Sequence, residues 1–176
     1  MVDESGRGRT LIQDTQRPDL ARLYREHLAG EKLTRVAVAT GPGSFTGLRA
    51  GVSFGLGLAI GIRIPIVPLP TLELQAARSD APMTAVSEAG RGRVYYMAPG
   101  GKASLGDPAG VPTQHPLVGW VAPKTESALL ATGHVFKPES ELRSFGEAAA
   151  LLLETAREVA YGSLEIEYMQ SFSARR

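Results

Sequence analysis

The turn Gly41-Pro42-Gly43-Ser44 has the residue types that can hold a negatively charged group. Glycines let the backbone fold tightly, and the amides that open a following helix bind anions. A P-loop needs a Lys-Ser/Thr pair after its second glycine, but Thr46-Gly47 stands there. The dinucleotide pattern G-x-G-x-x-G also fails, because Thr46 occupies the third glycine position. We therefore interpret Ser44 as a helix cap, with a phosphate loop as the alternative.

Other reactive residue types show no pattern typical of a catalytic or metal site. The chain has no cysteine, which excludes disulfides and thiolate chemistry. No histidine has a second one at helical spacing, and no H-E-x-x-H pattern occurs: His27, His115 and His134 stand apart. Ser44 lacks the G-x-S-x-G pattern of a nucleophile elbow. The acidic pairs Glu139/Glu141 and Glu165/Glu167 are typical of solvated faces. The sequence predicts no metal, no cofactor and no catalytic residue.

The elements around the turn predict a strand, a tight turn and a helix. Residues 33–39 are apolar with β-branched Val36 and Val38, which predicts a buried strand. From Phe45 to Ile60 apolar residues recur at helical spacing. This helix carries glycines at steps of four, each of which costs about 1 kcal/mol against alanine in a helix interior. Glycines without side chains leave a groove on the helix surface, and another helix can approach there. The predicted groove runs along Gly47, Gly51 and Gly55.

The rest of the chain alternates strands and helices, which predicts an α/β fold. We expect helices at 15–29, 71–78 and 144–160, the last opened by a capping box at Ser144-Phe-Gly-Glu147. We expect strands at 64–67, 83–86, 93–97, 117–121 and 128–135, with 83–97 forming a hairpin. Residues 98–116 are rich in Gly, Pro, Ser and Asp and predict a surface excursion. Residues 164–169 predict a last strand or a tail laid on the surface.

Composition predicts an ordinary globular protein. The chain has 176 residues, 43% of them hydrophobic and 21% charged, with a formal net charge of +1. This balance and the absence of a long basic block do not favour nucleic-acid binding. The apolar run from Val52 to Ile62 is short and glycine-rich for a membrane span. With polar first residues, these features predict a cytoplasmic location and no membrane role.

The segment 41–49, GPGSFTGLR, together with the apolar glycine-rich helix and the run 64–72, IPIVPLPTL, strongly resembles the TsaB (YeaZ) family. These are bacterial tRNA threonylcarbamoyladenosine biosynthesis proteins. The resemblance implies an actin-like ATPase (ASKHA, ribonuclease H-like) fold with two lobes. We expect the first lobe, with the partner helix, over 1–80 and a second, smaller lobe over 81–176. Because the chain starts as if in the middle of the first lobe, we expect that lobe to be shortened and its first strand absent.

The resemblance also implies a role without catalysis. The chain would form a homodimer and dock on a TsaD-type subunit, with a TsaE-type ATPase as third member and tRNA reached only through the complex. Partner-binding residues would be Leu20, Leu23, Tyr24, Gly47, Gly51 and Gly55. The motif loop would comprise Gly41, Pro42, Gly43, Ser44, Phe45, Thr46, Gly47 and Arg49.

Two other functions stay open at the level of sequence. One is a peptidase- or nucleotide-binding enzyme of the glycoprotease-like superfamily, against which the missing histidine pair weighs. The other is direct RNA binding, which the lack of interleaved aromatic and basic residues disfavours.

The head of the hairpin at Glu88-Ala-Gly90 resembles the Asp-Ala-Arg of the family, with Arg91 one position later.

Overall fold

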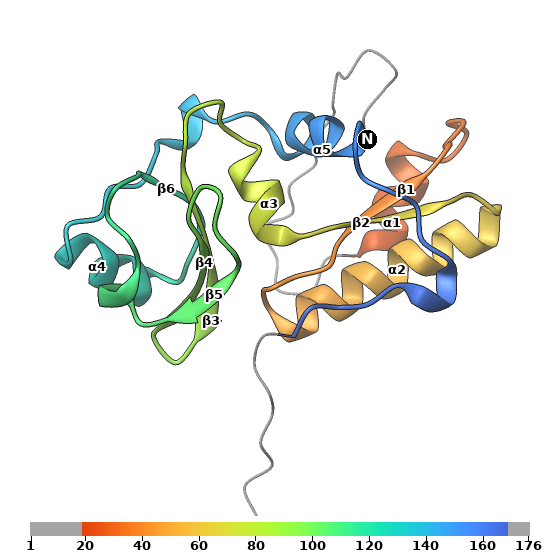
Figure 1. The fold of residues 1–176 in the computed structure, drawn as a ribbon. Helices are drawn as coiled ribbons and strands as arrows, with labels where there is room; N and C mark the ends of the chain where they lie inside the picture. Colours follow the sequence, from red (N-terminus) through yellow and green to blue (C-terminus); the bar gives the residue numbers. More distant parts are fainter. Residues whose placement is uncertain (1–18, 169–176) are drawn as a thin grey trace, which may run out of the picture.

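The computed structural model describes residues 19–168, which form two β-sheets with helices around them (Figure 1). The first sheet pairs β1 (Val36–Ala39) with β2 (Ile66–Leu69) in parallel, Val36 opposite Ile66. Parallel neighbours need a long crossover connection, and helix α2 (Phe45–Ile62) supplies it. The sequence therefore predicted the kind and order of these elements, although β1 starts at Val36 and α2 runs on to Ile62.

The second sheet has four strands in the order β5-β4-β3-β6. Its strands are β3 (Thr84–Gly90), β4 (Arg93–Met97), β5 (Ser104–Gly106) and β6 (Leu117–Trp120). The expected hairpin is present as the antiparallel pair β3–β4, and β6 pairs in parallel with β3. The excursion after β4 contains β5 and a short 3-10 helix, Pro108–Gly110.

One strand prediction was wrong. Residues 128–135 were expected to form a strand, but most of them belong to helix α4 (Pro123–Ala131) and the turn after it. Pro123 at the first helical position favours the helix, because its ring fixes a suitable backbone angle and its missing N–H is not needed there. The apolar run Ala128–Ala131 then buries Leu129 as one residue of a helix face.

Helix α3 (Thr71–Ala76) leads from the first sheet to the second, and α5 (Phe145–Leu153) lies back over the first (Figure 1). The capping box predicted at Ser144 and Glu147 is present, but α5 ends at Leu153 and not near Ala160. The remaining helices are α1 (Leu20–His27) and the 3-10 turns Glu139–Glu141 and Tyr161–Ser163. The division at residue 80 stays a prediction, and the expected shortening of the first lobe concerns residues outside the described ones.

Residues 159–168, here called the strap, run along α2 from its end to its beginning (Figure 1). The Val159 amide donates to the Ile66 carbonyl, and the Tyr161 hydroxyl donates to the Ile64 carbonyl at 2.9 Å. Leu164 and Ile166 pack on the core formed by Val38, Val52, Ala59 and Ile66. The strap is thus part of the first half of the molecule, although it is last in the described sequence.

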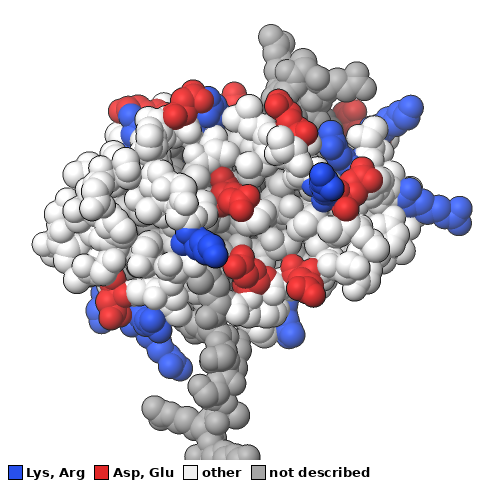
Figure 2. All heavy atoms as spheres, in the orientation of Figure 1, with Lys and Arg blue, Asp and Glu red and all other residues white. Residues whose placement is uncertain are grey.

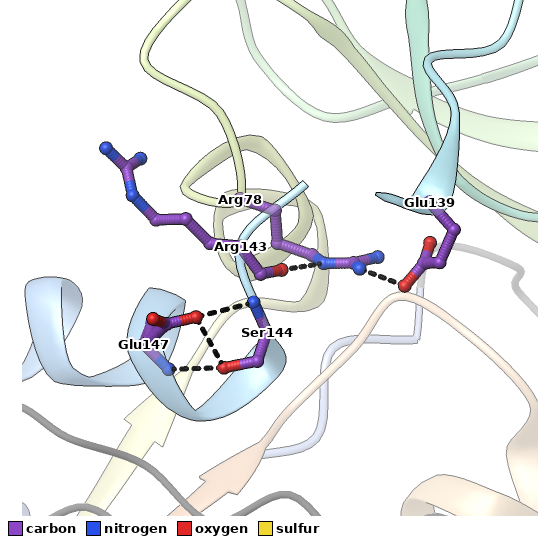
Figure 3. Close-up of polar contacts among 5 residues, drawn as sticks. All are labelled: Arg78, Glu139, Arg143, Ser144 and Glu147. Atoms are coloured by element: carbon purple, nitrogen blue, oxygen red, sulfur yellow. Dashed lines mark hydrogen bonds and ion pairs between the residues drawn. The ribbon is translucent and has the colours of Figure 1, made fainter. Parts of the chain in front are cut away.

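A polar clasp joins the end of α3 to the start of α5 (Figure 3). The Arg78 side chain is 4% exposed, and its guanidinium donates to the Arg143 carbonyl at 2.9 Å and to the Glu139 carboxylate. The same guanidinium lies 4.3 Å from the centre of the Phe145 ring. The Arg143 side chain turns away and pairs with Asp80, and its guanidinium lowers the pKa of that carboxyl. Because α3 packs on β3 and α5 on β2, the clasp ties the two sheets together.

Candidate functional site

The motif loop between β1 and α2 is held tightly from two directions. The Gly41 amide donates to Thr71 Oγ1 at 3.1 Å, and the Gly41 carbonyl accepts from the Thr71 amide at 2.7 Å. The Glu167 amide donates to the Thr40 carbonyl at 2.8 Å. Gly41 has a φ of 110°, and an added Cβ would lie 2.7 Å from the Glu167 carbonyl oxygen. Only glycine fits there, because both its backbone angle and the close strap exclude a side chain.

The first turn of α2 carries the rest of the motif. Ser44 is the N-cap, and its hydroxyl accepts from the Gly47 amide at 3.3 Å. Phe45 stacks at 5.4 Å against Tyr168 of the strap. Arg49 lies 4.4 Å over the Phe45 ring and donates through Nε to the Tyr168 hydroxyl at 3.3 Å. Arg49 therefore bridges α2 to the strap, while Thr46 and Gly47 are exposed.

A cleft of about 510 Å³ opens between the motif loop and the second sheet. Its walls come from Gly43 to Phe45, the head of the β3–β4 hairpin, Trp120 and the end of the strap. Acidic side chains lie along the middle of the face drawn in Figure 2, between the two sheets, together with basic ones. The cleft lining combines aromatic rings with two acidic residues, Glu88 and Glu167.

Glu88 is fixed at one wall of this cleft. Its carboxylate accepts the Gly90 amide at 2.8 Å and the Ala122 amide at 2.9 Å. It therefore joins the hairpin head to the segment after β6. Two backbone amides orient a carboxylate without cancelling its charge, and the acidic position noted in the sequence is thus an anchored anion. Arg91 lies at the tip of the turn with a φ of 56°, exposed.

The three stepped glycines do not share one open face, which corrects the sequence prediction. A Cβ added at Gly55 would lie 2.3 Å from Val38 Cγ1, so this glycine faces β1 of its own sheet. A Cβ at Gly51 would meet nothing within 4 Å, and one at Gly47 would touch only Ser44. The reason is the helical advance of about 100° per residue, which turns steps of four by about 40° each. Gly55 lets the helix approach its own strand.

Gly51 lies on a flank of α2 that we call the docking flank, defined by Gly47, Gly51, Phe54 and Leu58. These positions lie three or four residues apart and so share one side of the helix. The buried residues Leu48, Val52, Gly55 and Ala59 form the neighbouring side against the sheet. From Ala50 to Ile62 the helix has no charged residue, although Ile60 is 49% exposed and Ile62 is 40% exposed. By length and composition alone, α2 is the one helix within residues 19–168 apolar enough to cross a membrane.

Helix α1 carries the other residues predicted to bind a partner. Leu20, Leu23 and Tyr24 are each half-buried, and no residue of the helix is buried. Asp19 caps the helix by accepting the Arg22 amide at 2.9 Å. Whether α1 and α2 bind a partner together stays a prediction.

No group of three or more His, Asp or Glu side chains within 19–168 is placed to hold a metal ion. His134 is buried at 4% exposure, with Nε2 3.1 Å from the Val111 carbonyl oxygen and Nδ1 3.0 Å from Thr132 Oγ1. It connects α4 to the loop before β6 and is a structural residue.

Sequence reasoning missed the contributions of Trp120 and Glu167 to the cleft. Both lie far along the chain from the motif loop, and neither has a local pattern that would reveal the contact. Trp120 is 67% exposed, which a strand end within an apolar run does not predict. The contact of Thr71, at the start of α3, with the motif loop was also missed: its hydroxyl accepts from the Gly41 amide.

Comparison with known proteins gives a consistent result. The family model described as "TsaD: tRNA N6-adenosine threonylcarbamoyltransferase" matches residues 21–109. The "tRNA threonylcarbamoyladenosine biosynthesis protein TsaB" of Bacillus subtilis (strain 168) is 39% identical over 71 residues, 39% of this chain. The match spans 31% of that protein's length.

Two solved structures share the fold. YeaZ from Pseudomonas aeruginosa aligns with a TM-score of 0.59 at 19% identity, covering 85% of this chain and 80% of that one. A protein described by its similarity to peptidase YEAZ from Pseudomonas aeruginosa aligns with a TM-score of 0.61 at 18% identity, with the same coverage. With the family model, these structures confirm the predicted α/β, actin-like and ribonuclease H-like fold.

Proposed function

The chain belongs to the TsaB (YeaZ) family, and on that premise we propose that it is a non-catalytic partner subunit in tRNA threonylcarbamoyladenosine modification. In this proposal it docks on a TsaD-type subunit, which transfers the threonylcarbamoyl group. A TsaE-type ATPase is the third member, and tRNA is reached only through the complex. The work proposed for this chain is recognition of a protein surface.

The observation that supports this role best is the open, uncharged side of α2. Over Ala50–Ile62 the helix carries no charge, yet its outer side is open to solvent: Ile60 and Ile62 are exposed, and Gly51, Phe54 and Leu58 are partly exposed. A solvent-facing helix surface normally carries charged or polar residues. At Gly51 an added Cβ would meet nothing within 4 Å, so a partner helix can approach the backbone closely at this point. Apolar surface with small residues at its centre is typical of a protein contact.

Pairing of two copies through α1 and α2 is the second part of the proposal. Leu20, Leu23 and Tyr24 present an apolar side of α1 that no described residue buries fully. A two-fold contact uses the same patch on both copies, so α1 and α2 of each would build a four-helix arrangement. We expect the isolated protein to be a homodimer at micromolar concentration.

Absence of catalysis is the third part of the proposal. The motif loop is occupied by structural bonds from Thr71 and the strap, and Arg49 is engaged with Phe45 and Tyr168. These contacts make the loop a rigid base for α2. The proposal assigns it no reacting group.

The test replaces Gly51 with leucine on the docking flank and measures pulldown of the TsaD-type protein of the same organism. Because the leucine would project where the partner helix approaches, we expect pulldown to be lost while circular dichroism and thermal unfolding stay those of a folded protein. The matched control is Gly57→Leu, the same change at an exposed position of the same helix with nothing within 4 Å. Equal pulldown by the unaltered protein and Gly51→Leu would contradict the proposed contact.

A further inference from the structure

We propose that the cleft between the motif loop and the second sheet is a binding site for an organic cation, a guanidinium or ammonium group on a short apolar stem. This site is distinct from the docking flank of α2. The proposal depends on the chemistry of the cleft walls and not on the role assigned to the whole chain.

The first argument is the charge of the walls. Two carboxylates line the cleft, Glu88 and Glu167, and no lysine or arginine does. Glu88 is held in place by the amides of Gly90 and Ala122, so its negative charge is fixed before any ligand arrives. A preoriented carboxylate favours a cationic donor, because the hydrogen bond formed is charge-assisted.

The second argument is the aromatic content. Phe45, Tyr95, Trp120 and Tyr168 all line the cleft. Cations are attracted to the faces of such rings, most strongly to tryptophan. The chain itself shows the chemistry at the rim, where the Arg49 guanidinium lies 4.4 Å from the centre of the Phe45 ring. Trp120, on the opposite wall, is 67% exposed and has no ring or cation contact with another residue of 19–168.

The third argument is a largely buried tyrosine in the cleft wall whose hydroxyl is available to a ligand. Tyr95 is 6% exposed, packs in the core of the second sheet and also lines the cleft. Its hydroxyl makes no hydrogen bond to the part of the chain that the structure describes. Burial raises the pKa of Tyr95, although Arg93 opposes the shift, so the hydroxyl stays neutral at pH 7. It can accept a hydrogen bond from an ammonium or guanidinium group.

The start of α2 and Arg49 are the features that would favour an anion instead. A helix end contributes about half a positive charge, and its effect is confined to the first turn. Two amides of this turn already donate hydrogen bonds to Ser44: the Gly47 amide to its hydroxyl and the Leu48 amide to its carbonyl. Arg49 is stacked on Phe45 and bound to Tyr168 outside the cleft lining. The two carboxylates in the lining therefore set the sign of the preferred ligand.

The experiment uses the fluorescence of Trp120, the one tryptophan of the chain. The full chain is titrated with butylguanidinium, with neutral butylurea and with inorganic phosphate at constant ionic strength. We expect a saturable change with butylguanidinium at millimolar concentration, and binding of butylurea about tenfold weaker because it lacks the charge. A blocked tripeptide with central arginine, used in parallel, identifies the source: tighter binding of the peptide indicates a protein side chain, and tighter binding of butylguanidinium indicates a small molecule.

Variants separate a specific site from general attraction. Glu167→Gln should weaken butylguanidinium binding several-fold, while Glu165→Gln, an equal loss of charge on an exposed residue outside the lining, should leave it unchanged. Circular dichroism checks that both variants are folded. Equal binding of butylurea, a saturable response to phosphate alone, or an equal effect of the two substitutions would overturn the proposal, as would no saturable change with any cation.

Discussion

At the scale of single residues, the second half of the molecule buries polar side-chain atoms that have no hydrogen-bond partner. Thr84 Oγ1 and Gln75 Oε1 are buried and make no hydrogen bond within the described residues. Thr84 is fully buried in β3, one strand from the edge of the sheet. An unpartnered buried hydroxyl costs free energy, because the water it loses is not replaced.

Thr84→Val should therefore raise the free energy of unfolding, by about 1 kcal/mol, since valine has nearly the same shape and no polar atom to desolvate. Urea unfolding followed by circular dichroism measures this change. Thr132→Val is the contrasting variant, because that hydroxyl donates to the Leu129 carbonyl at 2.8 Å. A loss of stability in both variants would show that the Thr84 hydroxyl is satisfied in solution.

At the scale of elements, helix α2 has three faces. One packs on the first sheet, one lies beside the strap, and one faces solvent. The sequence predicted the helix from its apolar spacing and the turn before it from its glycines. It could not say which glycine faces what, because steps of four residues drift around the helix. That assignment needs the position of Val38 on β1, which is a tertiary contact.

Substitution by alanine should thus change the free energy of unfolding in opposite directions at Gly55 and Gly51. Gly55→Ala places a Cβ 2.3 Å from Val38 Cγ1, and such overpacking should lower the free energy of unfolding by about 2 kcal/mol. Gly51→Ala meets open space and removes the conformational cost of glycine, so it should raise stability by up to about 1 kcal/mol. Thermal unfolding of the two variants beside the unaltered chain measures both. The account of α2 packing would be wrong if Gly55→Ala were as stable as Gly51→Ala.

At the scale of the whole molecule, the connections between the sheets decide the shape. The chain leaves the first sheet through α3 and returns through α5, and the clasp around Arg78 joins the two passages. Local patterns predicted α3, the hairpin and the capping box of α5, because each depends on neighbouring residues. For residues 164–169 they predicted a last strand or a surface tail but not the packing of the strap along α2, and they missed α4 and the place of Trp120 at the cleft, because those depend on contacts between distant segments.

Arg78→Met should destabilise the molecule by about 2 kcal/mol, because the Arg143 carbonyl loses a buried donor and Phe145 loses the stacked guanidinium. Glu139 is exposed and is left in water, which limits the cost. Arg143→Met should have a clearly smaller effect, since that side chain pairs with the exposed Asp80 and otherwise makes one long hydrogen bond, 3.3 Å, to the Ala77 carbonyl. Denaturant unfolding followed by Trp120 fluorescence and by circular dichroism measures both variants. Equal effects of the two substitutions would contradict the role given to Arg78.

The central claim, that this chain is a protein-docking subunit, is tested most directly by co-purification of the unaltered chain with the TsaD-type protein of the same organism. Light scattering then gives the stoichiometry of the product. The account predicts a stable complex of defined stoichiometry, and a homodimer when the chain is alone, because the uncharged side of α2 is otherwise left in water. A folded chain that stays monomeric at micromolar concentration and elutes apart from the TsaD-type protein would contradict it.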